Sequence, residues 1–163
     1  MSINKFVPHI LVLPEDDANR QIANGFIQDL NLNERAIQVL PIAGGWKKVV
    51  DKFIEDHVNV MRQYRETRIV LLIDFDECED RLSYVESRIP EDLIDRVFVL
   101  GVQSNPESLR RDIQKSLETI GETLANDCAE NRNELWTHPL LIHNQPQLEQ
   151  MILSVKPFLF NNK

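Results

Sequence analysis

The fold is constrained most by one apolar run at residues 68–73 (RIVLLI). Its last five residues are all aliphatic, so the run lacks the alternation of a strand that has one face in water. A continuous run of this kind is typical of a parallel strand covered by helices on both faces. We therefore expect this strand at the centre of a parallel sheet.

Shorter apolar runs on either side repeat the pattern. Strands are predicted at 9–13, 36–42 and 97–102, and each is followed by apolar residues at helical spacing. The helical patterns cover 22–30, 49–61, 82–89 and 104–124. Residues 140–143 are a candidate fifth strand, with a helix opened by Pro146 after it. The alternation of strands and helices along the chain predicts a three-layer, Rossmann-like α/β fold, with helices on both faces of a mainly parallel sheet of four or five strands.

Length and hydropathy bound the organisation of the chain. We expect one domain over residues 1–163, in which 113–163 form a helical C-terminal extension. No apolar run approaches the roughly 20 residues that a membrane-spanning helix needs, and the first residues do not have the pattern of a signal peptide. A cytoplasmic location without membrane association is the resulting expectation.

The charge balance limits the partners that the chain can bind unaided. A formal net charge of −8 opposes contact with phosphate groups, because nonspecific nucleic-acid affinity comes mainly from clustered Lys and Arg. Any role on nucleic acid therefore requires a divalent metal, a local basic strip or a partner protein. A protein partner or a homodimer is consistent with the small size of the chain.

Acidic residues follow two of the predicted strands directly. Glu15, Asp16 and Asp17 come after the first strand, and Asp74 and Asp76 after the third. The carboxyl ends of parallel strands share one edge of the sheet, where ligands bind in such folds, so these groups should meet in space. Asp16 and Asp17 also have the simpler interpretation of capping the next helix.

This acidic set has the chemistry of a magnesium site. Carboxylates without a nearby histidine favour Mg²⁺ or Mn²⁺ over zinc, and a phosphodiester would complete the coordination shell. Side chains at every second position of a strand share a face, so Asp74 and Asp76 are predicted to point to the same side. The candidate metal ligands are Glu15, Asp74 and Asp76.

Three segments together, LVLPE, VLPIAGG and VLLIDFD, resemble the Toprim domain of topoisomerases, primases and OLD-type nucleases. The resemblance covers roughly residues 8–112. It implies that Glu15, Asp74 and Asp76 are catalytic, bind Mg²⁺ and serve phosphodiester cleavage or transfer on nucleic acid, with DNA favoured over RNA. The chain carries Asn19 where OLD-type members carry an aspartate four positions after the glutamate. No tyrosine falls at a position for a topoisomerase-type nucleophile, so the resemblance favours a hydrolytic nuclease.

Two other interpretations remain open at this point. ILVLPEDDANR also resembles the first strand and acidic loop of a response-regulator receiver, in which Asp74 would accept a phosphoryl group. Alternatively, the fold is a noncatalytic scaffold for a partner protein. Lys47 and Lys48, beside Trp46 and after the Gly44-Gly45 turn, are weaker candidates for contact with a nucleic-acid backbone, since a Trp at a helix start also packs on a sheet.

Overall fold

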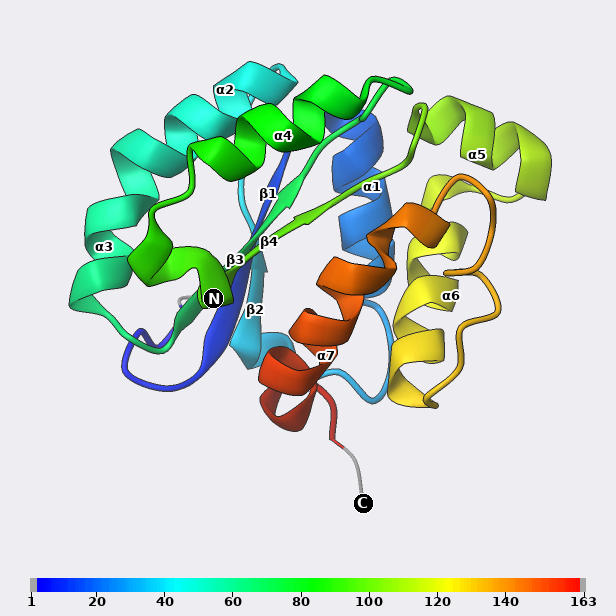
Figure 1. Ribbon diagram of the computed structural model, residues 1–163. Helices are drawn as coiled ribbons and strands as arrows, with labels where there is room; N and C mark the ends of the chain where they lie inside the picture. The colour runs from blue at the N-terminus through cyan, green and yellow to red at the C-terminus, as the bar shows by residue number, and fades with distance from the viewer. Residues whose placement is uncertain (1–2, 162–163) are drawn as a thin grey trace.

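Four short strands pair in parallel in the order β2-β1-β3-β4 (Figure 1). In the computed structural model, which describes residues 3–161, they are β1 (His9–Pro14), β2 (Ile37–Val39), β3 (Thr67–Leu72) and β4 (Val97–Leu100). The apolar run at residues 68–73 supplies most of β3, which lies between β1 and β4 as predicted. The α/β class and the parallel sheet are confirmed.

The two faces of the sheet carry separate cores because neighbouring residues of a strand point to opposite sides. On β3, Val70 faces one core and Ile69 and Leu71 face the other. Helices α1 (Asp17–Phe26), α5 (Pro106–Ile113), α6 (Leu117–Ala129) and α7 (Gln145–Leu159) cover the first face. Helices α2 (Trp46–Lys52), α3 (Val58–Gln63) and α4 (Glu79–Ser87) cover the second, as Figure 1 shows. A π-helix, Phe53–His57, joins α2 to α3.

The long helix predicted over 104–124 is wrong, because the chain breaks between α5 and α6. Gln114 has a left-handed backbone (φ 59°), and Ser116 Oγ accepts a hydrogen bond from the backbone N–H of Thr119, 3.1 Å away. This serine cap starts α6 in a new direction although the apolar spacing continues through the break. Helix α5 is capped by Asn105, whose Oδ1 accepts from the N–H of Ser108.

The candidate fifth strand at 140–143 is also wrong. Residues 142–144 form a short 3₁₀ helix, and the edge of β4 is satisfied by side chains in place of a strand. Asn144 exchanges two hydrogen bonds with the backbone of Gly101, and Gln147 Oε1 accepts from the N–H of Val99. An edge strand that is paired in this way needs no further neighbour.

Smaller differences lie at the ends of elements. The second strand is shorter than predicted, and α1 ends at Phe26, which leaves Leu30 97% exposed beyond it. The helix predicted after Pro146 is present as α7. Within the predicted extension, residues 113–161 contain α6, the short 3₁₀ helix and α7, and apolar side chains of α6 and α7 share the core of α1 and the sheet. No helix within residues 3–161 is both long and apolar enough to cross a bilayer.

Helix α1 packs closely against α6 at two glycines, Gly25 and Gly121. A Cβ atom on Gly121 would lie 2.0 Å from the carbonyl oxygen of Ile22, and one on Gly25 would lie 1.9 Å from that of Glu118. Both distances are shorter than any contact between nonbonded atoms, so neither position can hold a Cβ atom unless the backbone moves. The two glycines therefore set how closely α1, the helix that begins with the acidic residues, approaches the rest of the protein.

We predict that Gly121→Ala lowers the free energy of unfolding. Alanine favours a helix by about 1 kcal/mol over glycine, but forcing a methyl group into a closed contact costs about 1–3 kcal/mol and displaces α1 as well. Urea denaturation should show a net loss of stability. Glu122→Ala, at the neighbouring exposed position, should change it by less than about 0.5 kcal/mol. Equal stability of the two variants would contradict the close contact.

Candidate metal centre

The acidic residues collect where β1 and β3 end side by side. From β1 the chain passes to β2 on one side and later returns to β3 on the other, so the gap between β1 and β3 is the switch point of the sheet. Glu15 directly follows β1, and its N–H donates to the carbonyl of Leu72 at the end of β3 (2.9 Å). This bond fixes the start of both acidic loops relative to each other.

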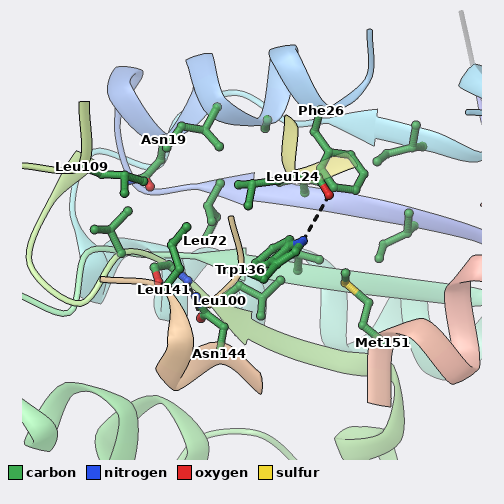
Figure 2. A pocket seen from close by; sticks show the side chains of 18 of the residues that line it. Asn19, Phe26, Leu72, Leu100, Leu109, Leu124, Trp136, Leu141, Asn144 and Met151 are labelled. Carbon is green, nitrogen blue, oxygen red and sulfur yellow. Dashed lines mark hydrogen bonds between the residues drawn. The ribbon is translucent and has the colours of Figure 1, made fainter. Parts of the chain in front are cut away.

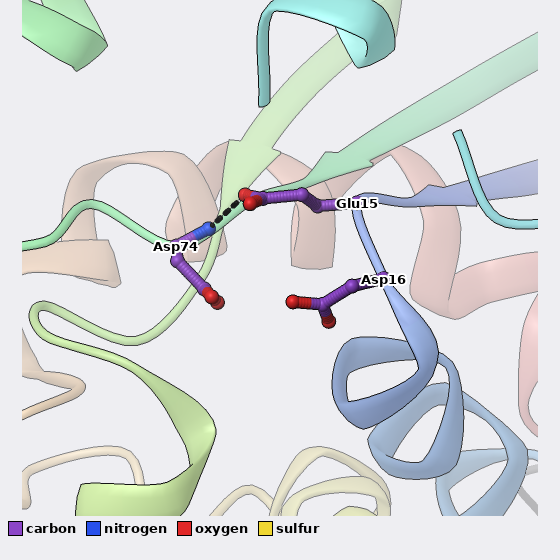
Figure 3. Close-up of side chains that lie close together, drawn as sticks. All are labelled: Glu15, Asp16 and Asp74. Carbon is purple, nitrogen blue, oxygen red and sulfur yellow. Dashed lines mark hydrogen bonds between the residues drawn. The ribbon is translucent and has the colours of Figure 1, made fainter. Parts of the chain in front are cut away.

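Three carboxylates converge at this point (Figure 3). Glu15, Asp16 and Asp74 each offer an oxygen, and these oxygens all lie within 4.8 Å of one another. Glu15 Oε1 accepts from the backbone N–H of Asp74 (2.8 Å), which ties the two loops together a second time. The carboxylates of Asp16 and Asp74 face each other across the gap. The convergence predicted for the two acidic segments is therefore present for Glu15 and Asp74.

A buried amide bridges two of these carboxylates. Asn19 is fully buried in the first turn of α1, and its Nδ2 donates to Asp74 Oδ1 (2.8 Å) and to Asp16 Oδ1 (3.0 Å). The same Asp16 oxygen accepts from the backbone N–H of Asn19, so Asp16 also caps α1 as the sequence indicated. One side chain thus fixes the position of both aspartates.

Burial makes this arrangement costly when all three groups are charged. Two carboxylates about 4 Å apart repel by about 4 kcal/mol at an effective dielectric constant near 20. Burial, reinforced by the charges of Asp16 and Glu15, raises the pKa of Asp74 to about 7 despite the hydrogen bond from Asn19. Burial also raises the pKa of Glu15, against the hydrogen bond from the N–H of Asp74. Asp74 is therefore partly protonated near neutral pH.

Asp76 does not join this group. The alternation of β3 stops before Asp76, which has a left-handed backbone (φ 50°), as does Glu77 (φ 55°). The side chain of Asp76 is 68% exposed and lies 3.4 Å from Arg81 Nη2. Arg81 Nη1 donates to the carbonyl of Asp74 (2.8 Å), so the arginine spans the turn between the two aspartates. The same-side pairing predicted for Asp74 and Asp76 is absent because the strand does not continue that far.

The turn formed by Gly44 and Gly45 is hydrogen-bonded to the backbone of Glu15. Gly44 has a positive φ of 96°, and its N–H donates to the carbonyl of Glu15 (2.8 Å). Lys48 is exposed and its side chain lies next to this turn. Lys47, also exposed, extends over the rings of Trp46 and Tyr84 at 5.5 and 5.7 Å from their centroids. Both lysines are thus on the site's side of α2, outside the carboxylate group.

The donor set fits a hard divalent ion. Glu15, Asp16 and Asp74 supply only carboxylate oxygens, the ligands that Mg²⁺ and Mn²⁺ prefer. A cation among them would counter the burial and the repulsion that raise the pKa of Asp74, and would stabilise its charged form. The group to hold it is therefore Glu15, Asp16 and Asp74, with Asp76 at the margin.

Asn19 also lies at the edge of an internal cavity between the sheet and helices α1, α6 and α7 (Figure 2). The cavity measures about 80 Å³ and its walls are almost entirely apolar. Its other polar side chain, Asn144, is fully paired with Gly101. Asn19 Oδ1 has no hydrogen-bond partner within residues 3–161, so the bonds of its Nδ2 to the aspartates determine which way the amide points.

Neither family models, nor curated proteins, nor solved structures show a significant match to this chain. The site must therefore be interpreted from its own geometry.

Two members of the site were not assigned from the sequence. Asp16 belongs to the acidic segment that was expected to meet Asp74, but it was not among the predicted metal ligands; it caps α1 and also joins the carboxylate group. Asn19 lies on the same face of α1 as Ile22 and Ala23, which are buried. A polar residue on the apolar face of a helix is expected to be buried and paired, and this signal identifies Asn19.

The raised pKa of Asp74 predicts a pH-dependent stability. Unfolding returns this pKa from about 7 to 3.8, so the folded protein binds the proton more tightly. The proton on Asp74 therefore makes its full contribution to the stability of the fold below pH 3.8, and this contribution is lost as pH rises through about 7. In urea denaturation from pH 4 to 8, Asp74→Asn should therefore lose less stability with rising pH than the wild type.

The exposed Asp95→Asn supplies the matched control, because it removes the same group from a solvated position. The free energy of unfolding of this variant should depend on pH as that of the wild type does. If Asp74→Asn shows that same dependence, burial does not hold a proton on Asp74.

Proposed function

We propose that this protein is a Mg²⁺- or Mn²⁺-dependent enzyme that cleaves or transfers phosphodiester bonds in nucleic acid. The observation that carries the proposal is the convergence of Glu15, Asp16 and Asp74 at the switch point of a parallel sheet. Ligands of such sheets bind beyond the carboxyl ends of the strands at this point. The segments that supply these residues are also the ones whose sequence resembles Toprim domains.

Each residue has a role that its surroundings support. Asp74 and Asp16, fixed by the amide of Asn19, face one gap and would hold the ion there. Glu15 uses one oxygen to accept from the N–H of Asp74, and its other oxygen is available to bind the ion or to exchange a proton with the sugar oxygen. A bound divalent ion stabilises negative charge on the reacting phosphate.

Arg81 supports the substrate side of the proposal. It donates to the carbonyl of Asp74, and its half-buried guanidinium lies 3.4 Å from the carboxylate of the exposed Asp76. A guanidinium in this position suits a phosphate oxygen next to the ion, since Arg binds phosphate with two parallel hydrogen bonds. The acidic group and its adjacent cation therefore match the two charges of a metal-bound phosphodiester.

Metal binding gives the first test of the proposal. Mn²⁺ titrated into the wild-type protein should release a measurable heat in calorimetry. Glu15→Gln combined with Asp74→Asn removes two of the three charged ligands and should abolish that heat. An unchanged heat in the double variant contradicts the metal centre and favours the noncatalytic scaffold.

Asp76→Asn is the matched control, because it makes the same chemical change outside the three-carboxylate group. Its Mn²⁺ heat should stay close to that of the wild type. Loss of binding in this variant would instead support the Asp74 and Asp76 pair implied by the family resemblance.

Catalysis requires a separate experiment. With Mn²⁺ present, the wild type should nick supercoiled plasmid DNA, and Glu15→Gln should be slower by about 100-fold or more, the usual loss when a group for proton transfer is removed. Glu122→Gln, on the exposed face of α6, controls for the charge change and should retain full activity. Equal nicking by wild type and Glu15→Gln would show that the activity does not come from this site. Acyl-phosphate labelling of Asp74 would support the receiver-like alternative.

A further inference from the structure

A row of cations supported by aromatic rings begins at the candidate metal centre and runs along α2 and α4. We call Trp46, Lys47, Arg81, Tyr84 and Arg88 the α2–α4 strip. Figure 1 shows the two helices side by side on one face of the sheet, and Trp46 of α2 meets Tyr84 of α4 edge to face with 5.3 Å between the ring centroids. Each cation of the strip lies over one or both of these rings.

The contacts give the strip a defined order. The Arg81 guanidinium lies 5.0 Å from the Trp46 ring, Lys47 Nζ lies over both rings, and the Arg88 guanidinium lies 4.6 Å from the Tyr84 ring. Arg81, at the inner end, donates to the carbonyl of Asp74. The strip therefore starts in direct contact with the acidic site and leads away from it.

The positive charges of the strip are largely free of local partners. Within residues 3–161, Lys47 and Arg88 are exposed and neither forms an ion pair within 4.0 Å, although Asp51 and Glu86 lie on the same two helices. Arg81 reaches only the exposed Asp76. In a chain of net charge −8, two exposed cations without an ion pair, in a row with Arg81, indicate a surface that binds an anion.

We infer that the α2–α4 strip binds the backbone of a single-stranded nucleic acid and leads that strand to the candidate metal centre. This inference rests on the proposed function and names its substrate as a single strand. Arg81 lies in α4 and Arg88 is the C-cap residue of that helix, seven residues later and about 10 Å along the helix axis, which corresponds to about three nucleotides of a stacked strand.

The geometry favours one strand over a duplex. The cations form a single row, whereas a duplex presents two backbones separated by a groove about 12 Å wide. Partly exposed aromatic side chains between cations suit unpaired bases, whose faces are free to stack. The rings also hold the Lys and Arg side chains extended, which reduces the entropy lost when they bind phosphate.

Fluorescence anisotropy with a labelled oligothymidine of about twelve nucleotides tests the strip, and EDTA keeps metal and cleavage out of the measurement. Each phosphate contact contributes about −0.7 to the slope of log K against log salt for a single strand. Lys47→Gln with Arg88→Gln should therefore reduce the slope by about 1.4 and weaken binding about tenfold. Arg35→Gln with Lys115→Gln removes the same charge from exposed positions elsewhere and should leave the slope unchanged.

Several results would overturn the inference. One is an equal salt slope for the two double variants. Another is tighter binding of the corresponding duplex than of the single strand. A third is a wild-type dimer in sedimentation velocity that dissociates in the Lys47→Gln, Arg88→Gln variant. The last result would assign the strip to a second copy of this acidic chain. Asp74→Asn, measured in parallel, separates the two proposals. If this variant binds the oligonucleotide but does not nick plasmid DNA, the strip is supported. If the wild type binds the oligonucleotide but takes up no Mn²⁺, the proposed function alone is contradicted.

Discussion

The site depends on how the ends of β1 and β3 are joined. The N–H of Glu15 donates to Leu72, and the Glu15 carboxylate accepts from the N–H of Asp74, so two acidic loops that are distant in sequence are bonded to each other twice. These bonds oppose a repulsion of about 4 kcal/mol between neighbouring charged carboxylates. The paired strands of the parallel sheet keep the two loops in position despite that repulsion.

The protein satisfies these acids only in part with its own groups. The amide of Asn19 donates to Asp16 and Asp74, yet burial still raises the pKa of Asp74 to about 7. A carboxyl with a raised pKa at the ligand-binding end of a sheet makes this position a candidate functional site. The closely packed glycines of α1 and α6 contribute indirectly, because they determine where Asn19 and the first turn of α1 lie.

The sequence predicted the parts of the structure that are governed by burial and periodicity. The run that forms β3 is apolar on both faces, and the acids beyond β1 and β3 had to meet once the sheet was parallel. It did not predict features that depend on single backbone angles or on distant partners. Asp76 turns away through a left-handed residue, the serine cap at 116 divides a continuous apolar stripe, and Asn144 satisfies the β4 edge from 43 residues away.

The most direct test of the central claim is an anomalous diffraction map from crystals soaked in Mn²⁺. Manganese bound at the site should give one strong peak within coordination distance, about 2.0–2.3 Å, of carboxylate oxygens from Glu15, Asp16 and Asp74. A map with no peak among these three groups, or with manganese bound only elsewhere on the acidic surface, would contradict the central claim.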